Sequence, residues 1–317
     1  MPARFAIEAW DPGYGAAAGE AALTESPVLT DLGVEVPEAS WAPRRPAPGT
    51  AAAASVLFVD GVRRIDARVW LSGAGSDVAQ GICASYAAGA VRSEAARAEI
   101  VDARVERGVF ARAVEGAEPI EADVGSTRLR FVLVPVPTDQ FDQLSFRLQD
   151  AMGRLEVDAA EAARARATEL VLVDGPLRAL HRVPGTVGYV KHHEAGYGAP
   201  VVRATLARLA PGERTPVFLM GERFVRYSWY VRLPGAGSDH PLAGVVRCEV
   251  AARGSIESIV AGADQVTASL PRFASAAHKD PRAPQNLYPI AGLERALRRR
   301  LGEPLLILRA LRAAARV

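Results

Sequence analysis

The stretch Ser55-Val56-Leu57-Phe58-Val59-Asp60-Gly61 marks the start of the β-rich part of this 317-residue chain. Its run of apolar residues predicts a strand buried on both faces, with an aspartate where the strand ends and a glycine at which the chain turns. The pattern returns as Glu169-Leu170-Val171-Leu172-Val173-Asp174-Gly175. Two buried strands that each end in aspartate can place two carboxylates side by side, which is how a sheet builds a divalent-metal site. The alternative is two ordinary turns, because Asp-Gly is a common turn pair.

The rest of the chain predicts an N-terminal arm followed by one large domain. Residues 1–54 contain short apolar patches among acidic residues and end in a Pro/Ala-rich linker, so we expect an arm there and a domain over residues 55–317. Within that domain, residues 62–71 suggest the hairpin partner of the first strand, and residues 93–107 could form either a helix or a strand. Further strands are predicted at 81–91, 128–136, 185–191, 217–220, 227–233 and 242–250. From Ile256 onward the pattern is helical apart from 281–289, and the last element, 305–315, could be a helix or a strand.

Composition and charge are those of a soluble globular protein, with 49% hydrophobic and 23% charged residues and a net charge of +2. The charge is unevenly distributed, because residues 281–317 hold eight arginines against two glutamates. A basic C-terminal surface is compatible with nucleic acid, but it is equally compatible with a solvated helix face.

The chain carries no sign of a disulfide framework or a membrane anchor. Its two cysteines, Cys83 and Cys248, lie far apart without a CxxC motif, which argues against a zinc site. No signal peptide is recognisable, and no apolar run reaches the roughly 18 residues that a membrane span needs. We therefore expect a cytoplasmic protein without a membrane partner.

The most regular helix is predicted at 146–166. Its apolar residues recur at helical spacing on one stripe, namely Leu148, Ala151, Met152, Leu155, Ala159, Ala162 and Ala163. Glu156 lies at the margin of this stripe, whereas Glu161 points to solvent. A carboxylate at that margin can reach a site on the sheet, although it can also be an ordinary boundary residue. Strands, then a helix, then further strands predict an α/β fold with one mixed sheet flanked by helices.

Three carboxylates thus occur in the order strand, helix, strand: Asp60, Glu156 and Asp174. This layout resembles that of RNase H-like nucleases, and the sequence is similar to the NurA family of DNA-end-processing nucleases. The similarity spans most of residues 55–310 and rests on a series of motifs in order. They are VDG at 59–61, RLE at 154–156, VDGPL at 173–177, GYVK at 188–191, SWYVRL at 228–233 and GVVRCEV at 244–250.

The resemblance implies a manganese- or magnesium-dependent nuclease that acts on single-stranded DNA and duplex ends. Asp60, Glu156 and Asp174 would hold the metal, and two cations sharing carboxylate oxygens suit such a ligand set. Lys191 would sit near the scissile phosphate as a point charge, and His278 would complete the catalytic residues. Members of this family form dimers and work with HerA, a hexameric DNA-translocating ATPase. DNA, a second copy of the chain and a HerA-type ATPase are therefore the expected partners.

The C-terminal part departs from the family pattern, in which a tyrosine is followed by a histidine. Here His278 precedes Tyr288. His278 could orient a water or bind phosphate, and Asp280 could be a further ligand, but a loop-capping histidine is the alternative. The pair His192 and His193 is a second candidate, of which only one could reach the site, because neighbouring side chains on a strand point to opposite faces.

Two other functions stay open at this point. A non-catalytic DNA-binding or scaffold protein with the same fold is favoured if the acids do not converge or if Glu156 faces solvent. An actin-like phosphotransferase also begins with a strand ending in Asp-Gly, but Val62-Arg63-Arg64 lacks the glycine- and threonine-rich hairpin that it needs. The apolar patches of the arm predict a docking surface for a second copy or for the ATPase, with an arm folded back on its own core as the alternative.

Overall fold

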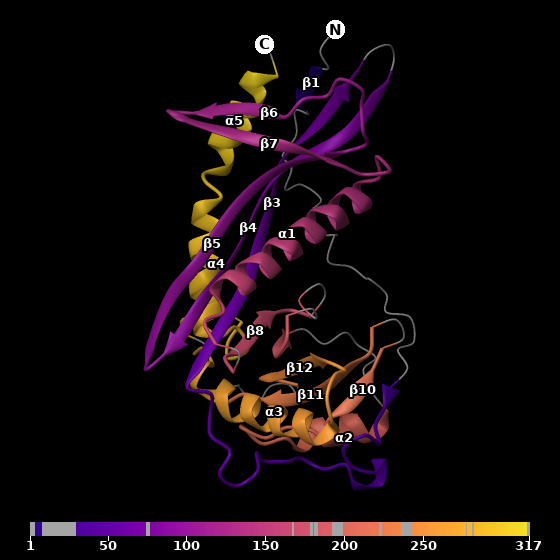
Figure 1. Ribbon diagram of the computed structural model, residues 1–317, viewed down its shortest axis with the longest axis vertical. Coiled ribbons are helices and arrows are strands. Elements are labelled where there is room, and N and C mark those ends of the chain that lie inside the picture. Colours follow the sequence, from indigo (N-terminus) through magenta and orange to yellow (C-terminus); the bar gives the residue numbers. More distant parts are fainter. Residues whose placement is uncertain are drawn as a thin grey trace.

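The computed structural model has one long mixed β-sheet with helices on both faces (Figure 1). The structure describes residues 4–7 (backbone only), 30–73, 77–166, 168–177, 180, 183–191, 199–221, 224–235, 242–276, 278–280 and 282–315. Within them the strands are β1 (Arg4–Ile7), β2 (Thr30–Asp31), β3 (Ser55–Ser72), β4 (Val78–Glu94), β5 (Arg97–Ala111), β6 (Ile120–Val124), β7 (Thr127–Pro135), β8 (Leu170–Asp174), β9 (Thr186–Val190), β10 (Phe218–Met220), β11 (Arg226–Arg232) and β12 (Val245–Ala251). The α-helices are α1 (Phe141–Ala163), α2 (Pro200–Arg208), α3 (Ile256–Ser269), α4 (Tyr288–Arg300) and α5 (Pro304–Ala314).

The central strands follow the order β5-β4-β3-β8-β9. β3, β4 and β5 are antiparallel neighbours, and after α1 the chain returns as β8, which pairs parallel to β3. β9 then pairs parallel to β8, and β12, β11, β10 and β2 extend the sheet in antiparallel fashion. An antiparallel meander, a helix and then parallel strands added beside the first strand make the RNase H-like arrangement. The expected α/β fold is confirmed.

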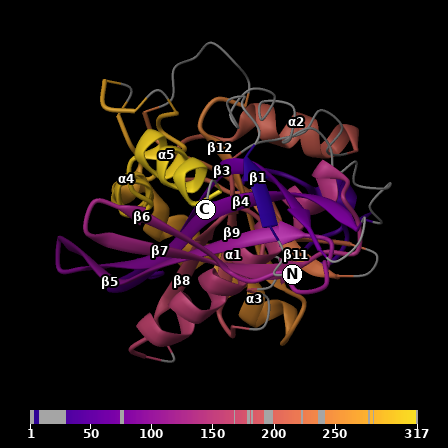
Figure 2. The same ribbon diagram turned by 90° about the horizontal axis from the view of Figure 1, so that it is seen from above.

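The two faces of β3 belong to different helix layers, because side chains alternate along a strand. Leu57 and Val59 pack in a core with Ala160 of α1. Phe58 packs on the opposite side, in the core that includes Leu293 of α4. Figure 2 shows the same division, with α4 and α5 on one side of the long strands and α1 on the other. Residues in even positions near Phe58 therefore face α4.

The outer halves of β3, β4 and β5 continue into a second, smaller core, which we call the distal lobe. It comprises these strand halves together with β1, β6, β7 and α5, and its buried residues include Val69, Phe131, Ile307 and Leu311. β1 pairs with the end of β3, and β6 and β7 form a hairpin beside β5. The first described strand and the last helix thus meet at one end of the molecule (Figure 1).

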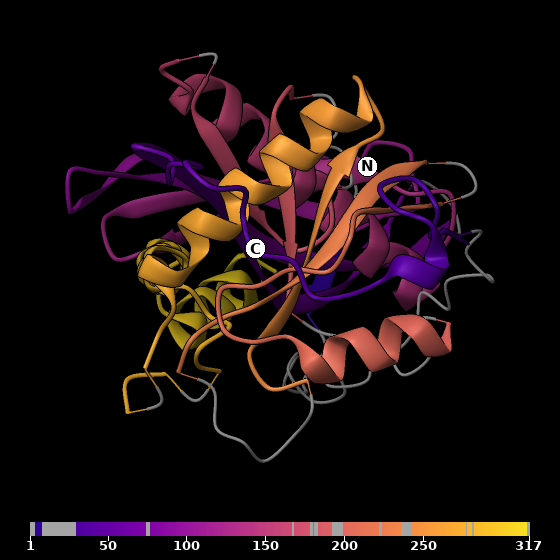
Figure 3. The ribbon, with the colours of Figure 1, turned by 90° about the horizontal axis from the view of Figure 1, so that it is seen from below.

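The described part of the N-terminal arm packs on its own chain. Trp41 is 4% exposed, and its ring nitrogen donates a hydrogen bond of 2.8 Å to the carbonyl of Leu32. β2 pairs with β10, and the following segment runs beside α3, where the amide of Ala53 donates to Ser269 Oγ (Figure 3). Of the other apolar patches of the arm, residues 5–7 are described only for their backbone, as part of β1. Residues 28–29 lie outside the described residues.

The predicted turn at Gly61 is wrong, because β3 runs through it without interruption to Ser72. Residues 62–71 are therefore the continuation of the first strand, and its hairpin partner is β4. The second Asp-Gly pair does turn, since Gly175 has a φ of 97°. A positive φ of this size suits glycine, which has no Cβ to clash.

The structure decides the two elements that were left open and differs from the expectation at two others. Residues 93–107, left between helix and strand, lie mostly in β5, and the last element is the helix α5. The strand predicted at 128–136 exists as β7, but most of it is not buried, because it covers only one side of the small distal lobe. Helix α2 was not predicted; Pro200 in its first turn is a normal helix start. None of the helices in the described ranges is long and apolar enough to cross a bilayer.

Candidate active site

Asp60 and Asp174 are neighbours because of the register between β3 and β8. The last parallel pair of residues is Val59 and Val173, so the two aspartates follow at the same level of adjacent strands. Adjacent strands lie about 4.8 Å apart, and residues at one level point to the same face. Both carboxylates therefore lie on the α4 side of the sheet. Asp60 is only 7% exposed.

The electrostatics of Asp60 reflect this crowding. Burial raises the pKa of its carboxyl well above the usual value, and the negative charges of Asp174 and Glu156 raise it further. The positive charge of Lys191 acts in the opposite direction. Burial likewise raises the pKa of Asp174, again opposed by Lys191. The acids therefore lie close enough to disfavour one another's ionised forms, and a cation between them would relieve this repulsion.

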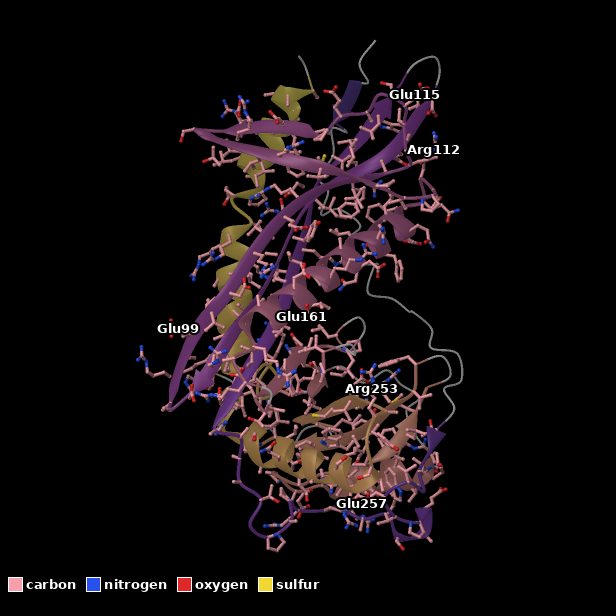
Figure 4. All side chains as sticks on the ribbon, in the orientation of Figure 1. Glu99, Arg112, Glu115, Glu161, Arg253 and Glu257 are labelled. Atoms are coloured by element: carbon pink, nitrogen blue, oxygen red, sulfur yellow. The ribbon has the colours of Figure 1, made fainter. Side chains whose placement is uncertain are left out.

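Glu156 reaches β3 from the α1 side through the space left by Gly61. A Cβ at Gly61 would stand 2.7 Å from Glu156 Oε1 and 2.9 Å from Met152 Cγ. A side chain at this position would displace Glu156 or Met152, so glycine permits the close approach of α1. Glu156 is 8% exposed, whereas Glu161 of the same helix is exposed (Figure 4). Glu156 does not face solvent, so that ground for a non-catalytic protein is absent.

Lys191 follows β9 and contacts the aspartate on the neighbouring strand. Its Nζ donates hydrogen bonds of 2.6 Å to Asp174 Oδ2 and 2.8 Å to Asn286 Oδ1. The side chain of Lys191 is 9% exposed. Asn286 is fully buried and donates in turn to Asp280 Oδ2 at 2.6 Å. A continuous polar chain thus leads from the strand ends to the loop before α4.

The helix α4 covers the site from the same face as the two aspartates. A Cβ at Gly89, which pairs with Asp60 across β3 and β4, would lie 3.2 Å from Leu293 Cδ1. The next residue, Glu294, accepts hydrogen bonds from Arg282 at 2.8 Å and from Arg298 at 2.9 Å. Its negative charge raises the pKa of both aspartates. Sequence reasoning missed Glu294, although a glutamate in an arginine-rich helix was a visible signal.

A second buried acid supports the loop that follows Asp174. Glu249 of β12 is 1% exposed, and its Oε1 accepts a hydrogen bond of 2.8 Å from the amide of Leu177. Arg226 and Arg247 pair with its other oxygen at 2.9 and 3.3 Å. Glu249 belongs to the motif GVVRCEV at 244–250, but only its contact with Leu177, 72 positions away, shows that it supports this loop.

The histidines predicted for the site are not brought into it by the described geometry. His278 lies on an exposed turn and makes no hydrogen bond or ion pair within the described ranges. Tyr288 serves that turn structurally, since its hydroxyl accepts a hydrogen bond of 3.1 Å from the amide of Ala276. His192 and His193 lie outside the described residues.

The predicted carboxylates fit a divalent cation by chemistry, but they do not form a closed ligand set. Carboxylate oxygens are the hard ligands that Mg²⁺ and Mn²⁺ prefer. Among the residues that the structure describes, no group of three His, Cys, Asp or Glu side chains is arranged to hold one ion. The cation at Asp174 is the ammonium of Lys191. Binding of a metal would therefore require Lys191 or the acids to move.

Comparison with known proteins gives similarity at the level of structure. No protein-family model matches the sequence, and no curated protein gives a significant match. The chain is similar to the NurA nuclease from Sulfolobus solfataricus, with a TM-score of 0.47 and 10% identity over 82% of this chain and 84% of that chain. It is also similar to the catalytic domain of human endonuclease V, with a TM-score of 0.33 and 16% identity over 82% of this chain and 87% of that chain. The structure comparison thus returns a member of the family that the sequence motifs resemble, and the chemical argument rests on the geometry given above.

Proposed function

We propose that this protein is a metal-dependent nuclease that hydrolyses phosphodiester bonds in single-stranded DNA and at duplex ends. The proposal is supported by one observation, the placement of Asp60 and Asp174 side by side at one level of the paired strands β3 and β8 in an RNase H-like sheet, with the charge of Glu156 from α1 acting on Asp60. Burying several like charges lowers stability unless a cation balances them, so such a cluster is a candidate functional site. Cleavage of phosphodiesters is the reaction for which this combination of acids and a neighbouring lysine is best suited.

The residues have distinct proposed roles. Asp60, Glu156 and Asp174 would hold Mn²⁺ or Mg²⁺, most simply as a pair of ions. Such ions supply a reactive water and charge for the leaving oxygen when bound. Lys191 contributes a positive charge beside Asp174, where a phosphate oxygen of the substrate can be neutralised. His278 is proposed to contact DNA from its exposed turn.

The exposed face of α4 is the proposed path of the DNA backbone. Arg295 and Arg299 are exposed, lie one helical turn apart and make no ion pair within the described part of the chain. Because Glu294 lies beside the two aspartates, this arginine face begins at the site and leads away from it along the helix. Unpaired arginines at such spacing attract phosphates without reading sequence. Basic residues at the C-terminal end of a helix also interact favourably with the helix dipole, which is an alternative role for these arginines. A DNA-binding measurement distinguishes the two roles.

The proposed partners follow from the resemblance to NurA nucleases. We propose a homodimer that works in DNA end resection with a HerA-type hexameric ATPase in the cytoplasm. Mass measurement in solution, for the chain alone and mixed with such an ATPase, tests both partners. A monomer that does not bind the ATPase would contradict this part while leaving the nuclease proposal in place.

The nuclease proposal is tested with single-stranded and blunt duplex DNA in the presence of Mn²⁺, Mg²⁺ or EDTA. We expect cleavage with either metal, none in EDTA, and loss of cleavage in Asp174→Asn. Cleavage that survives in EDTA or in this variant would contradict the proposed site.

A non-catalytic DNA-binding protein is the second candidate, and one observation favours it. Within the described residues the acids do not form a closed ligand set, and Asp174 is already paired with Lys191. The same experiment decides between the two functions. Salt-dependent DNA binding without cleavage under any metal would favour the binding protein.

A further inference from the structure

The hydrogen-bonded chain from Asp174 to Asp280 contains one residue, Asn286, that both accepts and donates a hydrogen bond. Asn286 accepts from Lys191 Nζ at 2.8 Å through Oδ1 and donates to Asp280 Oδ2 at 2.6 Å through Nδ2. Its orientation is fixed by its partners, because an ammonium can only donate and an ionised carboxylate can only accept. Asn286 is fully buried, and Asp280 is 8% exposed.

The loop around Asn286 is itself held in place. The other oxygen of Asp280 accepts a hydrogen bond of 2.8 Å from the amide of Arg282. Gln285 donates from its side chain to the backbone carbonyls of Lys191 at 3.0 Å and Val245 at 2.9 Å. A rigid loop therefore presents one acceptor, Asn286 Oδ1, to the lysine side chain.

We propose that Asn286 and Asp280 are positioning residues that hold the ammonium group of Lys191 at the carboxylate edge, ready to bind a phosphate oxygen of DNA. This inference rests on the proposed nuclease function and names the residues that make its lysine effective. A free lysine side chain has many rotamers, and restricting them in advance reduces the cost of binding an anion. Asp280 acts through Asn286, and neither residue has to contact the substrate.

The decisive variants keep or remove the two hydrogen bonds of the amide. Asn286→Leu removes both at nearly constant volume. Thr267→Val is the control, because it removes a buried side-chain hydrogen bond, to the carbonyl of Ala263 within α3, without touching the loop or the ammonium. The double variant Asp280→Asn/Asn286→Asp exchanges the amide and the carboxylate. It preserves the total charge, the acceptor for Lys191 and the acceptor for the amide of Arg282.

The first measurement does not depend on catalysis. The chain has only two lysines, Lys191 and Lys279, and Lys279 lies on the exposed turn. Limited acylation of lysines followed by peptide mass spectrometry therefore gives a ratio of Lys191 to Lys279 labelling within one molecule. We expect Asn286→Leu to raise this ratio by about tenfold, the size of effect that losing one hydrogen bond to a charged group produces. Thr267→Val should leave it unchanged, and the exchanged pair should restore it.

The second measurement links the ammonium to DNA. We expect Asn286→Leu to raise KM and the DNA dissociation constant in Ca²⁺ by about tenfold, as expected for one charge-assisted contact. The same substitution in a Lys191→Ala background should have almost no further effect, because its target is already gone. The exchanged pair should bind DNA like the original protein.

Each result has a definite meaning. An unchanged labelling ratio in Asn286→Leu, a failure of the exchanged pair to restore it, or additive effects of Asn286→Leu and Lys191→Ala would overturn the inference. If the protein cleaves no DNA at all, the nuclease proposal fails, whereas the labelling ratio and the DNA dissociation constants still decide whether Asn286 positions Lys191.

Discussion

The site end of the sheet and the distal lobe share three long strands, β3, β4 and β5, but they differ in how far their charged side chains are buried. At the site end, Asp60 and Asp280 are 7% and 8% exposed, and they lie among other buried polar groups. In the distal lobe, the side chains of ion pairs such as Arg112 with Asp77 and Arg128 with Asp123 are at least one third exposed. Arg112 lies at the edge of this lobe (Figure 4). Water screens these surface pairs, so they add little to stability.

This difference shows that the site end, and not the distal lobe, carries the free-energy cost of burying several acids together. Moving a carboxylate out of water is unfavourable, and placing two more acids beside it increases the penalty. The distal lobe packs apolar residues such as Phe131 and Leu311 instead. The buried carboxylate of Asp66 on β3, near this lobe, is paired with Arg64 at 2.8 Å. The site end keeps its buried charges in spite of this penalty, so they are already assembled before any ligand binds. Variants that remove a buried charge at the site end should therefore lower activity and raise stability. Variants that remove a surface charge in the distal lobe should change neither.

The largest effect is expected from Asp60→Asn and Asp174→Asn. Cleavage should fall by about three orders of magnitude or more, because each variant removes a proposed metal ligand and its charge. The melting temperature of the metal-free protein should rise, by roughly 2–4 °C for each kcal/mol of repulsion relieved. Asp77→Asn is the control in the distal lobe and should change neither quantity. Wild-type cleavage with normal metal dependence in either site variant would refute the proposed site.

Glu156→Gln should lower cleavage by about tenfold to a hundredfold and weaken Mn²⁺ binding, because the carboxylate beside Gly61 is a proposed ligand of the cation site. Glu161→Gln, on the exposed side of the same helix, should leave both unchanged. Activity assays and calorimetric titration with Mn²⁺ measure the two effects. Equal results for the two variants would contradict the argument from the helix face.

Gly61→Ala tests the close approach of α1 to β3. The added methyl group would stand 2.7 Å from Glu156 Oε1, so we expect a loss of about 1–3 kcal/mol in the free energy of unfolding. Gly262→Ala is the matched control on α3, where a Cβ meets nothing within 4 Å, and it should stabilise the helix by about 0.5–1 kcal/mol. Denaturant unfolding checks both. A stable Gly61→Ala variant with full activity would show that the gap at Gly61 is not needed.

The smallest effect is expected from single arginines on the exposed helix faces. Arg295→Ala and Arg299→Ala should each weaken DNA binding a few-fold and reduce the slope of log K against log salt by about 1. Arg309→Ala, an exposed arginine on α5 of the distal lobe, should not alter the slope. Fluorescence anisotropy in Ca²⁺ across a salt series separates these outcomes. Equal slopes for all three variants would remove α4 as the path of the backbone.

Much of the fold followed from local patterns. The apolar runs that end at Asp60 and Asp174 are buried strands. The segment predicted as a helix at 146–166 lies mostly in α1. Both predictions succeed because the periodicity of apolar residues records which face is buried. Neighbouring aspartates were also predictable, since two parallel strands with the same ending bring their last residues to one level. The extent of β3 was not predictable in this way.

Gly61 illustrates why local reasoning failed there. A glycine that turns the chain and a glycine that makes room for a helix look identical in sequence. Gly175 is the first kind, with a φ of 97°, and Gly61 is the second, because Glu156 and Met152 occupy the space of its missing side chain. Only the packing of α1 on β3 distinguishes them.

The sequence by itself determined the buried strands, the amphipathic helices and the acids at the strand ends, because each depends on residues close together along the chain. Tertiary structure decided which residues surround those acids. Asn286 meets Lys191 across 95 positions, and Arg226 of β11 meets Glu249 on the paired strand β12. Such partners are chosen by the path of the whole chain and by the need to satisfy each buried polar group, and no local pattern records that choice.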